Sequence, residues 1–454
     1  MSRSLPFLAR LFLLTFGWTA VIANARPFPP DVVVAADGTG DFRTIHDAVQ
    51  SIAPDNRERK IILVKAGVYV EQVRVDAAGI TLRGEHRSTT RLEFAHAHRE
   101  PAPERGRAVL NLSATAHDFV LEHFTVENTQ SELGIHAFAI FGLADRTVLL
   151  DSDVLSRGND TLSLWRGRAD GPAANASTLP DGSTAAWSGG GRYYHARLHV
   201  RGSVDFICPR GWCFMRDSTI TQVNPKASAA LWHDGSHDPD QKFVLRHCTF
   251  DGPTDWSLAR RHRDAQFFLI DCTFSASMRD RAPYRVIYPL DGRPPTEADR
   301  KRNADYDRTN LHGDRAYFHN SRREGGDFAW HRDNLSRAAG APSPGQVTAA
   351  WTFANSWDPE RTDAPRIVAL RHQAQPDRLM VVFSEPVTVR GDPVLTFANG
   401  EVARYLSGSG TPTLEFSSPH AAFSGTVPRF DLNGGALFAC EAGARLRLAA
   451  VGFP

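Results

Sequence analysis

The sequence has few cysteines, no excess of charge of either sign and, after its first segment, no long hydrophobic run. It contains 5 cysteines in 454 residues, so a fold held together by many disulfides is excluded. Its 52 lysine and arginine residues nearly balance its 51 aspartate and glutamate residues, which leaves no basic excess to follow a nucleic-acid backbone. We therefore expect no nucleic-acid partner. A neutral glycan or a small ligand fits this balance better than a polyanion held by charge alone.

The N-terminal segment has the pattern of a signal peptide. Arg10 precedes the apolar run LFLLTFGWTAVIA, and Ala23 and Ala25 supply the small residues that signal peptidase requires. The run is too short for a comfortable membrane span, and no later segment approaches the roughly 20 apolar residues of a spanning helix. We expect cleavage near Ala25 (signal peptide 1–25) and a secreted or periplasmic, monomeric protein without a membrane span. An uncleaved signal anchor is the alternative.

Similar phrases recur along the middle of the chain. KFVLRHCTFDG, from Lys242, and QFFLIDCTFSA, from Gln266, correspond position by position and share F, L, C, T and F, and each resembles two short strands around a polar corner. Such units bury their apolar faces only by stacking, so they predict an all-β solenoid of the parallel β-helix type. A β-propeller would require a more regular period with hairpin turns. Looser copies begin at Asp118, Arg146, Arg192, Trp212 and Arg315.

The ends of the solenoid have their own patterns. DFRTIHDAVQSI, residues 41–52, has apolar residues at helical spacing and predicts an amphipathic helix that covers the first coil. The aromatic segment TAAWTFANSWDP, residues 348–359, is expected to cover the last coil. Residues 164–191 lack apolar periodicity and predict a long loop, which either shapes a binding face or is an idle surface excursion.

A second unit begins near Ala364. Short apolar stretches follow one another at intervals of about ten residues with polar turns, which predicts a small antiparallel β-sandwich. The stretch FSEPVTVRGDPVLTFANGEVARYLSGSGTPTLEF resembles the Ig-like repeats of bacterial surface proteins. The predicted organisation is a signal peptide 1–25, a β-helix domain 26–362 and an accessory domain 363–454.

The cysteines suggest no metal site. Cys208 and Cys213 flank PRGW and form either a local disulfide or two free thiols, since their spacing without a second pair is a weak metal signal. Cys248 and Cys272 lie in the two closest repeats and are expected to be buried as apolar side chains.

Three charged residues stand out in the solenoid. Asp160 in SRGNDTLSLW, Asp205 in GSVDFICPRG and Arg260 in WSLARRHRD each lie near a strand corner of a different coil. Two carboxyl groups at short range separate their pKa values, so that one stays protonated while the other is ionised. An arginine can hold the ionised one in a bidentate pair. Spacing alone leaves a purely structural role open, because solenoids contain many polar corner residues.

Six phrases occur in the order in which they occur in a known family. They are VVVAADGTGDFRTIHDAVQSI, IILVKAGVYVEQVRV, ITLRGE, LEHFTVENT, GNDTLSL and GSVDFI, and together they resemble the pectin methylesterase (pectinesterase) family. The resemblance extends from Val32 to Asp358, and REGGDFAWHRDN and AWTFANSWDPE resemble its bacterial members. It implies a right-handed parallel β-helix and a carboxylic ester hydrolase that converts methylated homogalacturonan into pectate and methanol, without metal or cofactor.

The resemblance also implies roles for the three charged residues. Asp205 occupies the place of the aspartate that attacks the methyl ester, which implies a covalent aspartyl acyl-enzyme. Asp160 matches the general acid that protonates the departing methanol and then activates water. Arg260 matches the arginine that orients the nucleophile. These steps fit covalent and acid–base catalysis.

This sequence departs from the family pattern around those residues. His136 and Asn159 stand where the family has two glutamines that stabilise the oxyanion, and both can donate a hydrogen bond there. His136 can equally be an inward residue with no role in the reaction. Aromatic residues of the family are replaced by His262, Ser163 and Cys208, which weakens sugar stacking. Substrate contacts are therefore expected from His262, Trp165, Trp212 and Phe206.

Two other functions remain open at this stage. One is a glycan-binding β-helix protein whose catalysis is impaired, and the other is an esterase for a different uronate. A pectate lyase is disfavoured, because it would require a calcium-binding cluster of carboxylates that the spacing does not provide.

Overall fold

A computed structural model describes residues 30–99, 104–166, 190–226, 228–233, 238–360, 367–374, 377–397, 400–417, 429–431, 433 and 436–439. The expected signal peptide and most of the expected loop at 164–191 lie outside these residues. No helix in the described part is long and apolar enough to cross a membrane.

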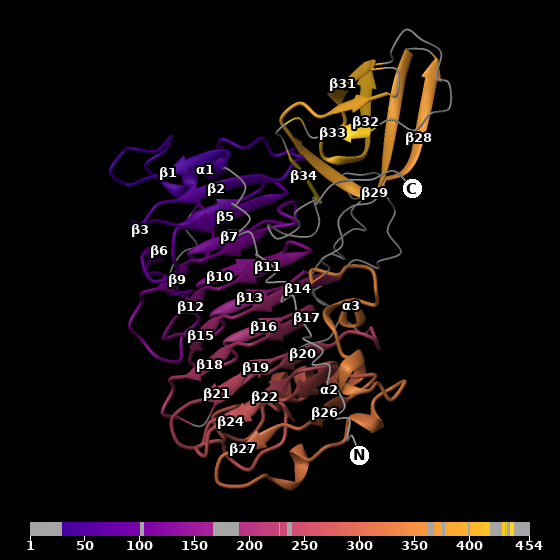
Figure 1. Ribbon diagram of the computed structural model, residues 1–454. Helices are drawn as coiled ribbons and strands as arrows, with labels where there is room; N and C mark the ends of the chain where they lie inside the picture. Colours follow the sequence, from indigo (N-terminus) through magenta and orange to yellow (C-terminus); the bar gives the residue numbers. More distant parts are fainter. Residues whose placement is uncertain are drawn as a thin grey trace, which may run out of the picture.

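Most of the chain forms a parallel β-helix, which confirms the predicted fold class (Figure 1). Each coil contributes one strand to each of three parallel sheets with ten, nine and eight strands, so strands next to each other in a sheet come from successive coils. The sequence pattern suggested two strands per repeat, whereas each coil has three, because the strands of the eight-stranded sheet lie outside the repeated phrases. The ten-stranded sheet contains β1 (Val32–Val34), β2 (Lys60–Val64), β5 (Ile80–Gly84), β8 (Val120–Glu122), β11 (Thr147–Leu150), β14 (Gly191–Ala196), β17 (Gly211–Arg216), β20 (Phe243–Arg246), β23 (Ala265–Ile270) and β26 (Asp314–His319).

The other two sheets complete the coils. The nine-stranded sheet contains β3 (Gly67–Val70), β6 (Thr90–Phe94), β9 (Thr125–Asn128), β12 (Asp153–Leu155), β15 (His199–Gly202), β18 (Thr219–Gln222), β21 (Thr249–Asp251), β24 (Thr273–Phe274) and β27 (Arg322–Arg323). The eight-stranded sheet contains β4 (Val73–Val75), β7 (Leu110–Leu112), β10 (Ile140–Gly142), β13 (Leu162–Leu164), β16 (Ile207–Pro209), β19 (Ala229–Trp232), β22 (Ser257–Arg261) and β25 (Tyr284–Arg285).

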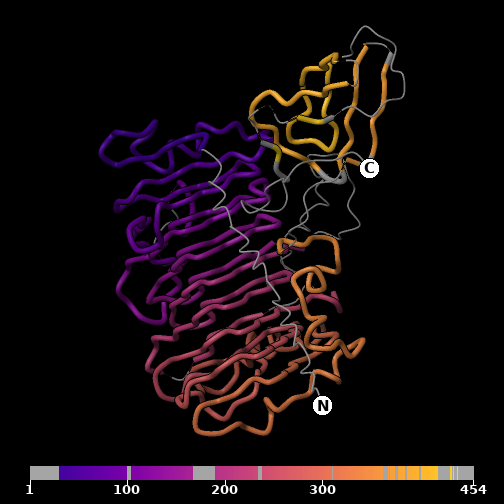
Figure 2. The backbone as a smooth tube through the Cα atoms, in the orientation of Figure 1, coloured from indigo at the N-terminus to yellow at the C-terminus, as the bar shows by residue number. Residues whose placement is uncertain are grey.

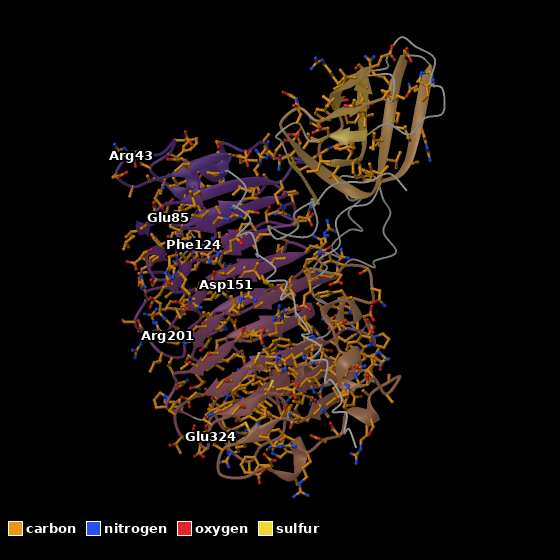
Figure 3. The ribbon with its side chains drawn as sticks, viewed as in Figure 1. Arg43, Glu85, Phe124, Asp151, Arg201 and Glu324 are labelled. Atoms are coloured by element: carbon orange, nitrogen blue, oxygen red, sulfur yellow. The ribbon has the colours of Figure 1, made fainter. Side chains whose placement is uncertain are left out.

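The interior of the coils is an apolar column. Phe124 is fully buried there, whereas Asp151 and Arg201 lie on the outer surface, where they pair with Arg197 and Glu127 (Figure 3). Cys248 and Cys272 belong to the same column, so their predicted burial is confirmed. Removing these side chains from water is the main favourable term in folding.

The predicted N-terminal helix is present as α1 (Ile45–Gln50) and covers the first coil. The side chain of Thr44 accepts a hydrogen bond from the amide of Asp47 and caps the helix. The carboxylate of Glu71 accepts hydrogen bonds from the amides of Ile45 and His46 at 2.7 and 3.0 Å. Because negative charge is favourable at a helix N-terminus, Glu71 fixes α1 on the open end of the solenoid.

The aromatic tail lies elsewhere than predicted. Phe353 and Trp357 pack on the outer face of the ten-stranded sheet together with Val148 and Phe214, beside β14 and β17 (Figure 1). The expectation that residues 348–359 cover the last coil is therefore wrong, because the outward side chains of that sheet are themselves apolar and need a cover. The tail contains the short helix α3 (Ala349–Thr352), and the segment before it contains η1 (Ala329–His331), η2 (Leu335–Arg337) and η3 (Pro344–Gln346).

The C-terminal strands form a separate sheet in which all pairings are antiparallel, as the alternating pattern predicted. They enclose their own apolar cluster. The predicted domain boundaries and the Ig-like resemblance stay predictions. The strands are β28 (Ile367–Ala374), β29 (Asp377–Arg390), β30 (Val394–Thr396), β31 (Val402–Ser407), β32 (Thr411–Ser417), β33 (Arg429–Asp431) and β34 (Ala436–Ala439).

This antiparallel sheet contacts the first coils of the β-helix, although the two are far apart in the sequence (Figure 2). Both terminal nitrogens of Arg390 bind the carboxylate of Asp31, directly before β1. Asp31 also accepts a hydrogen bond from the amide of Ile61 in β2 at 2.7 Å, and the side chain of Thr388 accepts one from the amide of Arg59 at 3.1 Å. The sheet thereby fastens the edge strand of the solenoid.

Replacing Arg390 with glutamine should loosen β1, because a charge-assisted pair to Asp31 is lost. We expect amide hydrogen exchange in Val32–Val34 to become about tenfold faster or more. Arg404→Gln, at an exposed arginine of β31, is the matched control and should leave that exchange unchanged. Equal exchange rates in both variants would contradict this fastening role.

Candidate active site

A cavity of about 300 Å³ opens on the outer face of the eight-stranded sheet. It lies over β13, β16, β19 and β22, which are neighbours in that sheet. Among the described residues it is lined by His136, Asn159, Asp160, Trp165, Asp205, Cys208, Arg210, Trp232, Arg260, His262, Tyr288 and Leu290.

The two acids reach this cavity because they occupy equivalent positions in successive coils. Asp160 and Asp205 each lie two residues before a strand, and those strands pair Leu162 with Ile207. Both aspartates have positive φ, 57° and 50°, a left-handed conformation that is uncommon outside glycine and that aspartate tolerates better than most residues. The chain therefore bends sharply at both acids before each strand begins.

Asp205 is held by Arg260 from β22. The Nε and Nη2 atoms of Arg260 donate to the two carboxylate oxygens at 2.8 and 2.6 Å. Both side chains are largely buried. Burial raises the pKa of Asp205 above its ordinary value, and the charge and hydrogen bonds of Arg260 oppose this rise. Arg260 is thus the group that favours an ionised Asp205 in a site with little water.

Among the described residues, no arginine forms a hydrogen bond or ion pair with Asp160, which lies beside His136. Burial and the negative charge of Asp205 raise the pKa of Asp160 well above its ordinary value, and the more distant Arg210 and Arg260 lower it only in part. The pair is therefore unequal: the proton resides preferentially on Asp160, and the charge on Asp205. A general acid beside a carboxylate nucleophile requires this division.

His136 and Asn159 lie beside Asp160. His136 Nε2 is 3.3 Å from a carboxylate oxygen of Asp160, and half of the His136 side chain is exposed. Burial, together with the nearby His98 and Arg260, lowers the pKa of His136, so the ring is neutral at neutral pH and has one N–H to donate. The amide nitrogen of Asn159 donates to the carbonyl of Gly134 at 2.9 Å, which leaves its second N–H for another acceptor.

Two of the four expected substrate contacts line the cavity and two do not. Trp165 and His262 are lining residues. Phe206 is fully buried in the apolar column, and Trp212 is 3% exposed on β17 of a different sheet, where it donates to Asp240. Neither Phe206 nor Trp212 can contact a sugar in the cavity from these positions.

Several lining residues were not expected from the sequence. Trp232, from β19, lies at the register position between Cys208 and Arg260, and its ring faces the guanidinium of Arg260 at 5.6 Å. Tyr288 and Leu290 come from a segment with no repeat pattern. Alignment of the repeats could have placed Trp232 next to Arg260. No pattern in the neighbouring sequence predicts that Tyr288 lies at the cavity.

A helix at the rim was also missed. α2 (Glu297–Thr309) begins with a capping box in which Thr296 and Asp299 bond each other's backbone amides. The T-x-x-D pattern formed by Thr296 and Asp299 could have indicated the start of this helix. The helix lacks an apolar face, so hydrophobic periodicity could not reveal it.

Cys208 and Cys213 are both buried and free, so the structure has the two thiols rather than the local disulfide. They lie on β16 and β17, which belong to different sheets. Cys208 lines the cavity, and burial raises the pKa of its thiol well above the usual value. Within the described residues, no group of three or more His, Cys, Asp or Glu residues is arranged to hold a metal ion.

The raised pKa of Asp160 predicts a pH-dependent loss of stability. An unfolded chain has an aspartate pKa of about 3.9, so the fold favours protonated Asp160. Its contribution is complete below about pH 4 and is lost as the pH rises through the raised pKa. The asparagine variant has no such titration. We therefore expect the melting temperature of Asp160→Asn minus that of the parent to increase from about pH 4 to about pH 8.

A matched control for this measurement is Asp255→Asn. Asp255 has the same left-handed conformation (φ 68°) two residues before β22, but it is exposed. The difference in melting temperature between Asp255→Asn and the parent should be constant over the same pH range. A constant difference for Asp160→Asn as well would show that Asp160 is not held protonated.

Comparisons with known proteins find pectinesterases that are similar to part of the chain. A family model described as Pectinesterase matches residues 31–169. A pectinesterase from Daucus carota is 30% identical over 216 residues, which cover 47% of this chain and 59% of the carrot protein. A pectinesterase from Petunia integrifolia is matched over 56% of its length, so the chain spans only about half the length of these relatives. They are plant proteins, and the expected bacterial type stays a prediction.

Solved structures agree in fold over a longer region. A pectin methylesterase in complex with a hexasaccharide has a TM-score of 0.53 and 18% identity, covering 73% of this chain and 99% of that chain. The pectin methylesterase PemA from Erwinia chrysanthemi has a TM-score of 0.52, with 18% identity over 73% of this chain and 98% of its own. The family-model match includes Asp160 but ends before Asp205 and Arg260. Residues 31–169 thus match the pectinesterase family model, and the β-helix shares its fold with these solved structures.

Proposed function

We propose that this protein is a carboxylic ester hydrolase that removes methyl esters from pectin, by means of an aspartyl acyl-enzyme on Asp205. The observation that carries the proposal is the unequal acid pair in one cavity, with Asp205 bound by Arg260 and Asp160 biased toward its protonated form. The relatives named pectinesterase and the neighbour solved with a hexasaccharide support the substrate class.

The first half of the reaction forms the acyl-enzyme. An ionised oxygen of Asp205 attacks the carbonyl carbon of the methyl ester, and the carbonyl oxygen takes the negative charge. His136 and Asn159 supply N–H donors beside this position. When the intermediate collapses, the bond to the methoxy oxygen breaks, and Asp160 gives its proton to that oxygen, so methanol leaves and an anhydride with Asp205 remains.

The second half restores the enzyme. Asp160, now ionised, takes a proton from a water molecule that attacks the uronyl carbon of the anhydride. The bond to Asp205 breaks, which releases the uronic acid, whose proton is then lost to water, and leaves Asp205 ionised and Asp160 protonated. Arg260 keeps Asp205 in position throughout and stabilises it as the leaving carboxylate. Ester and water are thereby converted into acid and methanol.

The protein is further proposed to act outside the cytoplasm, as a secreted or periplasmic monomer after cleavage near Ala25. The support is the arginine-flanked apolar run with its small-residue cleavage pattern. A polymer substrate of the size of pectin is consistent with an exported enzyme.

A glycan-binding protein with impaired catalysis is the second candidate. The observation in its favour is that one N–H of Asn159 is already used by Gly134, which reduces the donors available to an oxyanion. An esterase for another uronate would use the same acid pair and differ only in its sugar contacts.

Methanol release from methylated pectin tests the proposed catalysis. Asp205→Asn should reduce the rate by about 10³-fold or more, because it removes the nucleophile. Asp160→Asn should reduce it by about 10² to 10⁴-fold through loss of the general acid. Asp255→Asn, the equivalent exposed position, should keep the parental rate. Parental rates for both cavity variants would refute the mechanism, and pectin binding without methanol release would favour the second candidate.

Substitution of His136 tests the proposed oxyanion donor. Loss of one such donor lowers kcat by about 10² to 10³-fold, so His136→Ala should show a decrease of this size. His136→Gln should recover most of the rate, because its amide also donates. If the alanine variant keeps its kcat, His136 has no role in stabilising the oxyanion.

A further inference from the structure

Cys248 and Cys272 occupy equivalent positions in two successive coils. Each lies directly after a residue with positive φ, His247 (51°) or Asp271 (53°), and directly before a strand, β21 or β24 (Figure 1). The strands pair in register on both sides of the two cysteines, β20 with β23 and β21 with β24. The amide of Thr273 donates to the carbonyl of Cys248 at 2.9 Å. The two cysteines are therefore direct neighbours across the coils.

Both cysteine side chains lie inside the apolar column, where each residue is 1% exposed. The sulfur of Cys272 lies 3.5 Å from the carbonyl oxygen of Leu245, which belongs to the coil of Cys248. Burial raises the pKa of the Cys248 thiol well above its usual value, and a hydrogen bond with the thiol of Cys272 adds to this rise. The two thiols thus contact each other in a site without water.

The coils on either side have serine at this position. The side-chain oxygen of Ser218 accepts a hydrogen bond from the amide of Leu198 at 3.1 Å, and that of Ser321 accepts one from the amide of Cys272 at 3.2 Å. A thiol is a weaker donor and acceptor than a hydroxyl, so hydrogen bonding does not favour cysteine here. Two adjacent cysteines differ from two serines in one further respect, because they can form a covalent bond between the coils.

We infer that Cys248 and Cys272 are the site of an intramolecular disulfide, which links two coils of the β-helix when the chain folds in an oxidising compartment. Disulfides join residues whose Cα atoms are about 4.4 to 6.8 Å apart, and adjacent strands of a sheet have a separation of about 4.8 Å. The proposed export would bring the chain to a compartment in which disulfides persist. The inference is independent of the proposed ester hydrolysis.

The link forms by exchange with an existing disulfide, either oxidised glutathione or the disulfide of an oxidoreductase. The thiolate of one cysteine attacks that disulfide and displaces one of its sulfurs as a thiolate. The thiolate of the other cysteine then attacks the mixed disulfide and displaces the second. The two cysteines lose two electrons and two protons, and the oxidant leaves as two thiols. Because both sulfurs are buried in the folded chain, the exchange takes place before these coils close.

Peptide mapping tests the link directly. The full chain is folded in a buffer of oxidised and reduced glutathione, isolated in its folded state, alkylated and digested with trypsin. Cleavage after arginine places the two cysteines in separate peptides, 247–260 and 264–279. We expect mass spectrometry to find these peptides joined, and to find them separate after reduction. Alkylation of both Cys248 and Cys272, or a link from either of them to another cysteine, would overturn the inference.

Melting temperatures give a second measurement. The oxidised parent should melt about 5 °C above the reduced parent, because the link restricts the unfolded chain. Cys248→Ser should melt at the same temperature with and without reductant. Cys213→Ser, at a buried free thiol of β17, is the matched control and should keep the parental difference. A parent without this difference, or a Cys248→Ser variant that retains it, contradicts the link. Neither measurement depends on methanol release, so both remain decisive if the proposed esterase activity fails.

Discussion

Backbone hydrogen bonding between successive coils is the constraint on which the rest of this molecule depends. Parallel strands in register place equivalent residues of neighbouring coils about 4.8 Å apart. The bends before β13 and β16 are equivalent in this sense, so Asp160 and Asp205 come together although 44 residues separate them, from 160 to 205, in the sequence. Arg260 reaches the same place from β22, across the strand β19 that lies between. The solenoid thus gathers distant residues with little help from loops.

The cavity shows how burial and charge combine to give two identical side chains different properties. Removal of water raises the pKa of both aspartates and so disfavours the charged form of each. The guanidinium of Arg260 opposes it for one of them only, because its fork is bound to Asp205. The resulting negative charge raises the pKa of Asp160 further. One ion pair therefore decides which carboxyl group can attack and which can donate a proton.

Elements outside the coils contact the β-helix at its first coil, on the outer face of the ten-stranded sheet and near the cavity. The antiparallel sheet fastens β1 through Arg390, and the aromatic tail covers the apolar outer face of the ten-stranded sheet. Near the cavity, α2 has no apolar face and contributes polar and aromatic contacts to the lining residues Tyr288 and His262. A regular solenoid supplies a flat sheet surface, so segments outside the strands, which contribute Tyr288 and Leu290, add depth to the cavity, whereas Asp160, Asp205 and Arg260 come from the coils.

The sequence by itself determined the repeating β-fold, the N-terminal helix, the antiparallel sheet, and Asp160, Asp205 and Arg260 as candidates, because these depend on local periodicity and on short phrases. Only the tertiary structure decided the pairing of Arg260 with Asp205, the free state of Cys208 and Cys213, and the exclusion of Phe206 and Trp212 from the cavity. It also decided the position of Tyr288 at the cavity, where Asn303 of α2 bonds its backbone. These features depend on register between coils and on the direction of each side chain, and neither is set by the residues adjacent in the chain.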